Sequence, residues 1–320
     1  MYEDFIKAVN SSKSIAIISH QNPDGDTCGS ALALYRALKL YGKDNVNIFC
    51  DSEIKNTLRV MEGSDHYNEC EVAKCDLAIA CDCADMDRMG KYFELFNKSK
   101  IKVNIDHHKT NNRYGDINII EAGVSATCEV MYKIIKKFDS INRCLDDAVA
   151  KLLYSGIVTD SGGFTFSSVS EQTHFIASEL IKYNFSASEV CEHFLKTLPL
   201  NTFLLRARAF SHAKFFENGK IGLITFMQED FDITNTSAEN TEGAINFIRD
   251  VAGVEIAVAI TQMSNPNNYK VSIRTTDNVD ATRIAMVFGG GGHKNASGCR
   301  ISGFYEDVKD KLLKACRDEL

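Results

Sequence analysis

A histidine and two aspartates directly follow the first apolar run of this 320-residue chain. The segment SIAIISHQNPDGDTCGS (14–30) holds His20, Asp24 and Asp26 within seven positions, beside a proline and a glycine that favour a turn. Carboxylates this close repel one another, and a carboxylate removed from water is costly unless a cation compensates it. The segment is therefore either an ordinary solvated turn or part of a cation site, and the rest of the chain distinguishes the two.

Aspartate and histidine recur where later apolar segments end. The residues after DLAIAC (76–81), IKVNI (101–105) and DDAVAKLLYSGIV (146–158) include, in turn, Asp82 and Asp85, then Asp106, His107 and His108, then Asp160. In an open parallel sheet, ligands bind beyond the carboxyl ends of the strands. Any one of these residues has an ordinary explanation as a cap or a packing residue. Their recurrence at several strand ends favours a common site.

The residue types indicate which cation this site would take. Imidazole and carboxylate groups, without cysteines in a regular ligand spacing, suit Mn²⁺ and similar divalent ions. There are more such groups than one ion needs if positions are to stay open for substrate. Two ions that share a bridging aspartate fit better, and such pairs, about 3.5–4 Å apart, generate hydroxide and support an in-line phosphoryl displacement.

Strands and helices alternate in the first half of the chain. The runs that predict strands are SIAIIS (14–19), NVNIFC (45–50), DLAIAC (76–81) and IKVNI (101–105). Between the first two, residues 28–42 place Ala31, Leu34, Leu38 and Tyr41 on one helical face and end in glycine. This order predicts an α/β fold with a mostly parallel sheet and helices on both faces. Further helices are expected at about 125–138, 146–158 and 171–183.

We expect three parts along the chain: a metal-binding domain (1–186), a helical connector (187–212) and a smaller α/β domain (213–320). The smaller domain shows a hairpin with Asn218-Gly219 as its turn, a helix near 241–250, strands at VEIAVAIT (254–261) and YKVSIRT (269–275), and a helix ending in GGGGH. The candidate ligands lie in the first domain and the glycine run in the last. We therefore expect the active site in the cleft between them.

Composition restricts the partners. The net charge of −7 and the pI near 5.7 argue against binding to long duplex nucleic acid, which normally needs a basic face. No apolar run approaches the roughly 20 residues that span a bilayer, so no membrane segment is expected. The first ten residues read as an acidic helix and not as an export signal, and the eleven cysteines read as reduced thiols. We therefore expect a cytoplasmic location.

Five motifs resemble those of one family. HQNPDGDTCGS (20–30), IACDCAD (79–85), NIDHHKTN (104–111) and VTDSGGF (158–164) resemble the four successive motifs of the DHH phosphoesterase superfamily, which is named for Asp106-His107-His108. FGGGGHKNASGC (288–299) resembles the glycine-rich motif of the DHH-associated C-terminal domain. Motif order, spacing and total length are similar to the nanoRNase branch, which acts on short oligoribonucleotides and on 3′-phosphoadenosine 5′-phosphate (pAp).

The resemblance implies a role for each candidate residue. One ion would be held by His20, Asp24 and Asp82, and a second by Asp26, Asp82, His107 and Asp160. The ions implied are two Mn²⁺, with Mg²⁺ or Co²⁺ as alternatives. His108 would contact the scissile phosphate or protonate the leaving oxygen, while Asp106 and Asp85 would orient the imidazoles. Three cysteines adjoin ligands, Cys28, Cys81 and Cys83, with either a packing role or a redox role.

Substrate contacts are expected from both domains. A single glycine suffices to end a helix, so the run Gly289–Gly292 implies close approach of a ligand to the backbone. Gly290, Gly291, Gly292 and His293, with Arg274, would bind the far end of the substrate, where a guanidinium group can hold a phosphate through two hydrogen bonds. Ser161 and Arg113 would line the catalytic side.

The expected function is a Mn²⁺-dependent phosphodiesterase and phosphatase. It would hydrolyse short single-stranded RNA of two to five nucleotides to nucleoside 5′-monophosphates, and pAp to AMP. An alternative is the hydrolysis of linear or cyclic dinucleotides (pApA, pGpG, c-di-AMP) in second-messenger turnover. A non-enzymatic nucleotide sensor on the same scaffold is a third possibility. The resemblance also implies a homodimer.

Overall fold

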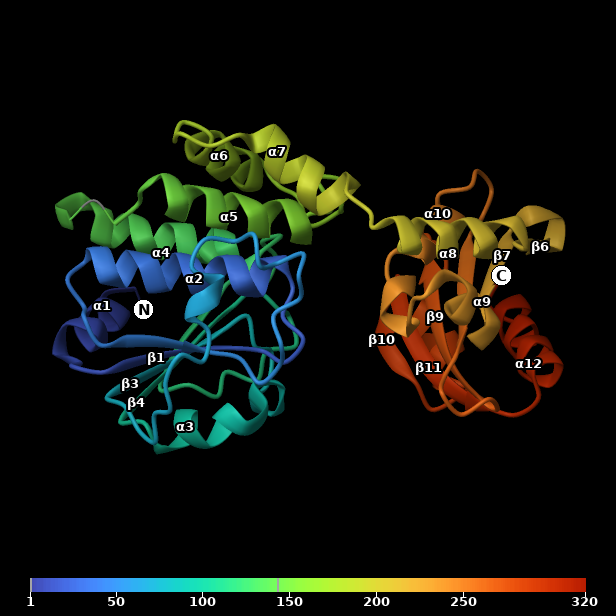
Figure 1. Cartoon of the computed structure of the whole chain (residues 1–320), viewed down its shortest axis with the longest axis horizontal. Coiled ribbons are helices and arrows are strands. Elements are labelled where there is room, and N and C mark those ends of the chain that lie inside the picture. Colours follow the sequence, from blue (N-terminus) through green and yellow to red (C-terminus); the bar gives the residue numbers. More distant parts are fainter. Residues whose placement is uncertain (1, 143) are drawn as a thin grey trace. The chain divides into compact units, whose positions relative to one another are not determined.

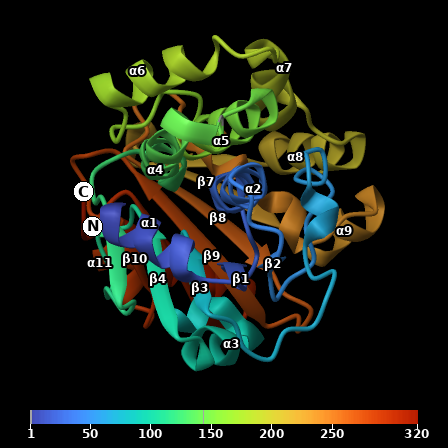
Figure 2. The same ribbon diagram turned by 90° about the vertical axis from the view of Figure 1, so that its left-hand side faces the viewer.

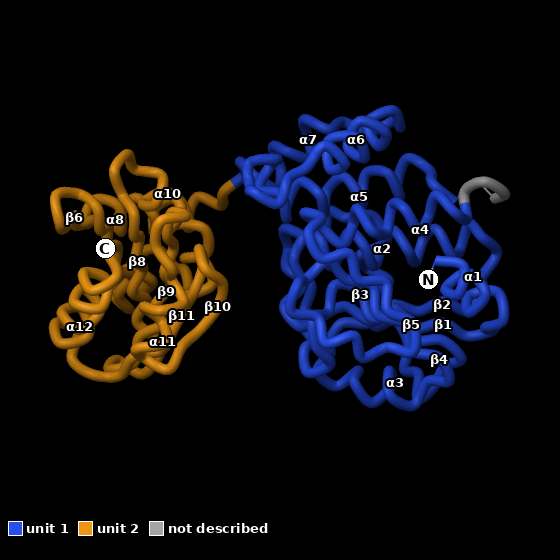
Figure 3. Tube along the Cα trace, turned by 180° about the vertical axis from the view of Figure 1, so that it is seen from behind, with its two compact units in different colours: residues 1–197 blue, residues 198–320 orange. Residues whose placement is uncertain are grey.

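The computed structural model describes residues 2–142 and 144–320. The chain forms two compact units, residues 1–197 and residues 198–320 (Figure 3). The division falls inside the segment 187–212, so the helix α8 (Leu200–Ser211) is part of the second unit. Among the described residues, no helix has both the length and the apolar character needed to cross a bilayer.

Unit 1 is built on a five-stranded sheet in the order β2-β1-β3-β4-β5, with every neighbouring pair parallel (Figure 1). Its strands are β1 (Ile15–Ser19), β2 (Val46–Phe49), β3 (Leu77–Cys81), β4 (Ile101–Asp106) and β5 (Ile117–Ile120). Its α-helices are α1 (Tyr2–Ser11), α2 (Gly25–Leu40), α3 (Phe93–Lys98), α4 (Thr127–Asn142), α5 (Asp147–Asp160), α6 (Glu171–Leu180) and α7 (Ala187–Cys191).

Both faces of the unit 1 sheet are covered. Ile15 and Ile17 of β1 face the core formed with α1, α2, α4 and α5, whereas Ala16 and Ile18 face a second core under α3. Figure 1 and Figure 2 show these helices on opposite sides of the sheet. Because central strands are buried on both faces, they read as continuous apolar runs and not as alternating patterns.

Most sequence predictions for unit 1 are confirmed. The four predicted strands and the helices α4, α5 and α6 are present within a few residues of the expected bounds. Strand β5, four residues (INII, 117–120) at the edge of the sheet beside β4, was not predicted. Helix α2 begins at Gly25, three residues earlier than its apolar pattern, because its first turn carries polar residues.

Unit 2 contains a six-stranded mixed sheet in the order β10-β11-β9-β8-β7-β6, in which only β7 and β8 pair in parallel. The strands are β6 (Lys214–Phe216), β7 (Ile221–Phe226), β8 (Ile256–Gln262), β9 (Asn268–Thr275), β10 (Gly291–His293) and β11 (Ala296–Ser302). The remaining helices are α9 (Gln228–Thr234), α10 (Ala244–Arg249), α11 (Ala281–Met286) and α12 (Tyr305–Arg317).

The hairpin predicted in unit 2 is confirmed: β6 and β7 are antiparallel, and Asn218 and Gly219 both have positive φ in the turn. The glycine run does more than end a helix. Helix α11 stops at Met286, Gly289 follows with φ of 70°, and Gly291 begins the edge strand β10. The run therefore becomes part of the sheet.

Candidate metal centre

The six predicted ligands gather at the carboxyl edge of the unit 1 sheet. They come from the end of β1, the start of α2, the end of β3, the end of β4 and the last turn of α5. Their ligand atoms form overlapping groups within 4.8 Å, and these groups are His20, Asp24 and Asp82; Asp26, His107 and Asp160; and Asp82, His107 and His108.

Asp82 occupies the middle of the centre. Its side chain is almost fully buried, and one carboxylate oxygen lies 3.6 Å from Nε2 of His20 while the other lies 3.8 Å from Nε2 of His107. The residue adopts φ of 57°, a conformation that costs free energy for a residue with a side chain. Its N–H donates to the carbonyl of Ile105 in the neighbouring strand β4 (2.9 Å), which fixes the position of Asp82 directly after β3. Asp82 is thus held where both ligand groups can share it.

Two threonines hold the carboxylate of Asp82 in place. The hydroxyl of Thr27 lies 2.7 Å from one oxygen, and the hydroxyl of Thr127 donates to the other at 2.9 Å. Burial alone would raise the pKa of Asp82, but the neighbouring imidazoles of His20 and His107 hold it below its usual range. The sequence motifs did not single out either threonine.

Asp24 and Asp26 are positioned by helix ends. Asp24 caps the start of α2 by accepting from the backbone N–H groups of Asp26 and Thr27. The carboxylate of Asp26 accepts from the N–H groups of Thr127 (2.6 Å) and Cys128 (2.9 Å), at the start of α4. Helix N-termini carry partial positive charge and stabilise carboxylates there.

The contact between α2 and α5 is unusually close around these carboxylates. A Cβ on Gly25 would lie 2.4 Å from Oγ1 of Thr159, and a Cβ on Gly156 would lie 2.9 Å from Oδ1 of Asp26. A Cβ on Gly29 would lie 2.7 Å from the carbonyl oxygen of Leu152. These glycines bring the first turn of α2 against the last turns of α5, which end in Asp160.

Hydrogen bonds fix the tautomers of two histidines. Nδ1 of His20 lies 2.7 Å from the carbonyl oxygen of Gln21, and Nδ1 of His107 lies 3.2 Å from that of Val124. A carbonyl only accepts, so each Nδ1 carries a proton, and in the neutral ring Nε2 is the nitrogen left to bind a metal ion. Both Nε2 atoms face the carboxylates, which is the arrangement of metal-ligating histidines.

The electrostatics of the centre fit a cation. Burial and the carboxylates of Asp82 and Asp160 raise the pKa of Asp26, and burial with the nearby carboxylates raises the pKa of Asp160 to about 7. Burial opposes the charge on His107, yet the surrounding carboxylates raise the pKa of its imidazole to about 9. Crowded carboxylates therefore hold protons that a divalent ion would replace, and the nitrogen and oxygen donors suit such an ion. These clusters could hold metal ions.

His108 and Asp106 form a separate hydrogen-bonded pair. Nδ1 of His108 donates to Asp106 (2.7 Å), and this bond raises the pKa of the imidazole. The other oxygen of the fully buried Asp106 accepts from Nδ2 of Asn111 (2.6 Å). Asp106 therefore orients His108, as predicted, and Asn111 orients Asp106, which sequence reasoning did not single out.

Two predictions for this region are corrected. Asp85 does not orient an imidazole: its carboxylate caps the 3₁₀ turn Met86–Tyr92 by accepting from the N–H of Arg88 (3.3 Å). Nη2 of Arg88 itself lies 3.2 Å from Nδ1 of His20. Ser161 is fully buried, and its hydroxyl accepts from the N–H of Phe164 (3.0 Å), so it shapes the turn after α5 and does not line an open site.

The other residues near the ligands are either exposed or inert. Arg113 has an exposed side chain, and its N–H donates to Asn111 (2.7 Å), so its contact with substrate remains a prediction. Cys28, Cys81 and Cys83 are fully buried, and burial raises the pKa of all three thiols. Buried thiols that resist deprotonation are poor redox groups, so packing explains them.

In unit 2, the sheet aligns the predicted substrate residues in rows. Ala296 of β11 lies opposite Arg274 of β9 on one side and His293 of β10 on the other. Residues directly opposite in antiparallel strands share a face, so Arg274 and His293 flank a single small side chain. The next row on this face is Ser272, Gly298 and Gly291. Side chains therefore fill little volume on this part of the sheet face.

Close backbone contacts explain two of the glycines. A Cβ on Gly290 would lie 2.3 Å from the carbonyl oxygen of Gly298, and one on Gly292 would lie 2.5 Å from that of Ala296. Gly291, by contrast, has open space where a Cβ would be. Only the first two are therefore required by packing within the sheet.

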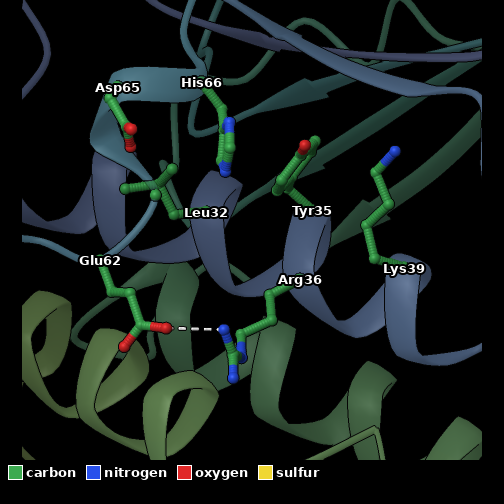
Figure 4. Close-up of a pocket in the computed structure, with 8 residues that line it drawn as sticks. Leu32, Tyr35, Arg36, Lys39, Glu62, Asp65 and His66 are labelled. Carbon is green, nitrogen blue, oxygen red and sulfur yellow. Dashed lines mark hydrogen bonds and ion pairs between the residues drawn. The ribbon is translucent and has the colours of Figure 1, made fainter.

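A pocket of about 420 Å³ lies elsewhere on unit 1, beside the second half of α2 (Figure 4). Arg36 lines it and pairs with Glu62 (2.6 Å) and Asp146 (2.7 Å), and the rings of Tyr35 and His66 lie 5.2 Å apart. The guanidinium group is neutralised within the protein, so the pocket offers little attraction to an anion.

Comparison with known proteins identifies the family. Residues 14–157 match the model of the DHH family, N-terminal domain, and residues 224–320 match the DHHA1 domain. The bifunctional oligoribonuclease and PAP phosphatase NrnA of Thermus thermophilus is 30% identical over 322 residues, which cover 99% of this chain and 93% of that protein. The chain belongs to the DHH family.

Two further proteins are similar over nearly the whole chain. The bifunctional oligoribonuclease and PAP phosphatase NrnA of Bacillus subtilis is 27% identical over 98% of this chain and 96% of its own length. The crystal structure of an exopolyphosphatase-related protein from Bacteroides fragilis matches with a TM-score of 0.91 and 24% identity, covering 99% of this chain and 95% of that one. The latter likeness establishes the α/β fold with its two sheets.

Proposed function

We propose that this DHH-family chain is a two-metal phosphoesterase that hydrolyses short RNA oligonucleotides to nucleoside 5′-monophosphates and pAp to AMP. The observation that carries the proposal is the position of Asp82, which belongs to the ligand group of His20 and to that of His107. The names of the Thermus thermophilus and Bacillus subtilis relatives support the choice of substrates.

The ligand set supports a pair of ions. His20, Asp24 and Asp82 would hold one ion, and Asp26, Asp82, His107 and Asp160 would hold the other. We propose Mn²⁺ for both positions, because mixed imidazole and carboxylate ligands suit it. When bound, such a pair supplies a hydroxide nucleophile and stabilises charge on the phosphoryl oxygens.

His108 has the properties of the general acid. Its Nδ1 donates to Asp106, so Nε2 is the atom left to act on substrate, and the same bond raises the pKa of the imidazole, which favours its protonated form. As the bond between phosphorus and the 3′ oxygen breaks, Nε2–H gives its proton to that oxygen. The products are a 5′-mononucleotide and a shortened RNA, or AMP and phosphate from pAp.

We propose that unit 2 supplies a second set of substrate contacts through Arg274, His293 and the glycines of β10. In these terms, residues 1–186 are the catalytic domain, 187–212 the connector and 213–320 the substrate-binding domain. A fragment that ends at residue 197, the limit of unit 1, should bind metal but lose most activity on an RNA dimer. Undiminished hydrolysis of the dimer by this fragment would refute the role of unit 2.

The substrate range decides between this function and its alternative. Mononucleotide release should be measured from an RNA dimer, a 5-mer and a 24-mer, and phosphate release from pAp, each with Mn²⁺ and with chelator. Fast, metal-dependent turnover of the short species and pAp, with a slow 24-mer, is expected. If only pApA, pGpG or c-di-AMP were hydrolysed, the second-messenger alternative would replace the proposal.

Location and assembly are further proposals. We propose a reducing cytoplasmic environment, because thiols such as those of Cys28, Cys81 and Cys83 are buried and outside any disulfide. A homodimer is proposed from the family resemblance alone. Light scattering on the purified full chain would give its mass, and a monomer at micromolar concentration would refute the dimer.

A further inference from the structure

The segment that follows Asp160 has a backbone conformation that costs free energy. Gly162, Gly163 and Phe164 adopt φ of 58°, 66° and 67°, three left-handed residues in succession. Glycine takes this conformation readily, but a bulky residue such as phenylalanine does so rarely. Such strain persists only where the surroundings enforce it, and it gathers at functional sites.

Hydrogen bonds and ring packing within unit 1 hold this segment in place. The carbonyl oxygen of Ser161 accepts from the N–H groups of Thr165 (3.0 Å) and Phe166 (3.1 Å). The ring of Phe164 packs against the core of unit 1 and stacks on His174 with centroids 5.3 Å apart and planes 22° apart. Residues 161–166 therefore form one rigid turn anchored by Phe164.

This turn offers no backbone donor to a phosphate. The N–H groups of Gly162 and Gly163 donate to the carbonyls of Thr159 and Val158, and that of Phe164 donates to Ser161 Oγ. The N–H groups of Thr165 and Phe166 both donate to the carbonyl oxygen of Ser161. A glycine-rich turn beside a phosphoryl site often binds an anion through free N–H groups, but here all five are already engaged.

What the turn does present is the ring of Phe166. Its residue is 49% exposed, although phenylalanine normally buries its ring. A Cβ on Gly162 would lie 2.6 Å from two ring atoms, so the ring rests on the backbone of Gly162, two residues from Asp160. One side of the ring is thus supported by the chain, while its exposed part is available to a planar ligand.

We propose that Phe166 stacks against the nucleobase of the nucleotide whose phosphate reacts, and so makes the centre select nucleotides over base-free phosphoesters. This inference rests on the proposed function, which supplies a substrate with a base. Stacking on an aromatic side chain accepts any base, which suits an enzyme that must degrade short RNA of every sequence. The strained backbone keeps the ring in place before substrate arrives, so little ordering is needed on binding.

Two matched substrates test the inference. One is pAp, and the other is ribose 3,5-bisphosphate, which carries the same phosphate groups without a base. The variants are Phe166→Ala, Phe166→Leu and Phe166→Trp, with Phe175→Ala as control, because Phe175 of α6 is similarly exposed (54%) but lies outside the turn. KM and kcat are measured for each pair in the full-length, Mn²⁺-loaded protein, together with Tm.

The expected result is selective. Phe166→Ala should raise KM for pAp about tenfold, with kcat and the constants for the base-free substrate within twofold of wild type. Phe166→Leu should resemble Phe166→Ala, because leucine keeps apolar contact but has no π face, whereas Phe166→Trp and Phe175→Ala should behave as wild type.

Other outcomes separate the two claims. An unchanged KM for pAp in Phe166→Ala, or an equal loss on both substrates, would overturn the stacking role while leaving the proposed function intact. A wild-type protein that hydrolyses neither pAp nor RNA would overturn the proposed function itself, and the stacking role with it.

Discussion

Nε2 of His107 lies 3.3 Å from a carboxylate oxygen of Asp160, although one residue follows β4 and the other ends α5. Two elements far apart in sequence therefore meet at one pair of side chains. In the metal-free protein, burial and the neighbouring carboxylates raise the pKa of Asp160 to about 7, whereas attraction to the same carboxylates outweighs burial and raises the pKa of His107 to about 9. Protons and metal ions compete for the same atoms.

The first prediction concerns the pH dependence of metal-free stability. Both groups have a folded pKa above the unfolded one, so each contributes stability below its unfolded pKa and loses it as pH rises through the folded value. For Asp160 this window runs from 3.8 to about 7, and for His107 from 6.5 to about 9. The Tm of chelated protein should therefore fall from about pH 6 to pH 9, while the stabilisation by Mn²⁺ should grow.

Calorimetry with chelator and with Mn²⁺ measures both trends. A His107→Gln variant is the control, because it removes the titration near pH 9, while the pKa of Asp160 should rise further without the neighbouring imidazolium. A metal-free Tm that rises over this range in the wild-type protein would contradict the prediction.

The second prediction compares two aspartates that lie three positions apart. Asp82→Asn should lower activity by more than about 100-fold, because even residues that merely orient metal ligands are worth 10–100-fold, and Asp82 belongs to two ligand groups. Asp85→Asn should retain Mn²⁺ binding, because Asp85 only caps a 3₁₀ turn. Isothermal titration measures the Mn²⁺ affinity of both variants. Equal losses of Mn²⁺ affinity in the two would refute the assignment of Asp82 as a metal ligand and of Asp85 as a helix cap.

The third prediction concerns Asn111. Asn111→Ala should lower kcat about 10- to 100-fold with little change in Mn²⁺ affinity, because Asn111 holds Asp106, and Asp106 in turn holds His108. The change should also lower the upper pKa of the pH–rate profile, since a loosened Asp106 supports the protonated imidazole less well. A variant with reduced Mn²⁺ affinity and an unaltered profile would place Asn111 in a purely structural role.

The fourth prediction separates packing from ligand contact in the glycine run. Gly290→Ala should destabilise the fold by about 1–3 kcal/mol, because the methyl group would collide with the carbonyl of Gly298. Gly291→Ala has open space, so Tm should stay within about 1 °C of wild type while KM for RNA dimers rises. A Gly291→Ala enzyme with unchanged KM would show that substrate does not approach this strand.

The ligand positions could be predicted from sequence because a parallel sheet gathers the ends of its strands at one edge. His20 and Asp82 directly follow an apolar run, and His107 comes one residue after another, so their convergence needed no knowledge of distances. Thr27 and Thr127 could not be found this way, because their hydroxyls matter only through contacts across the fold with Asp82. The prediction that Ser161 lines the catalytic side was wrong for a similar reason. A polar residue next to a ligand in sequence is expected to be exposed, and only the tight turn after α5 buries it.

In unit 2, too, the spatial arrangement of the candidate residues could not be predicted from sequence. The motif suggested the glycines, His293 and Arg274, but their alignment in one row depends on β10, β11 and β9 lying side by side in a particular register. A three-residue edge strand that begins in a glycine run carries no recognisable strand pattern, so this register had to come from the structure.

Gly25, Gly29 and Gly156, at the contact between α2 and α5, affect how the spacing of the metal ligands can change. Asp26 belongs to α2 and Asp160 to α5, so the gap between the two helices sets how far apart these carboxylates stand. One added methyl group at Gly156 would lie 2.3 Å from Sγ of Cys128 in α4 and 2.9 Å from Oδ1 of Asp26, so it would displace α4 and α2 while every ligand residue stays the same. Selectivity between larger and smaller cations can therefore be tuned at a helix crossing, and a laboratory search for altered metal preference should begin with the residues that have no side chain.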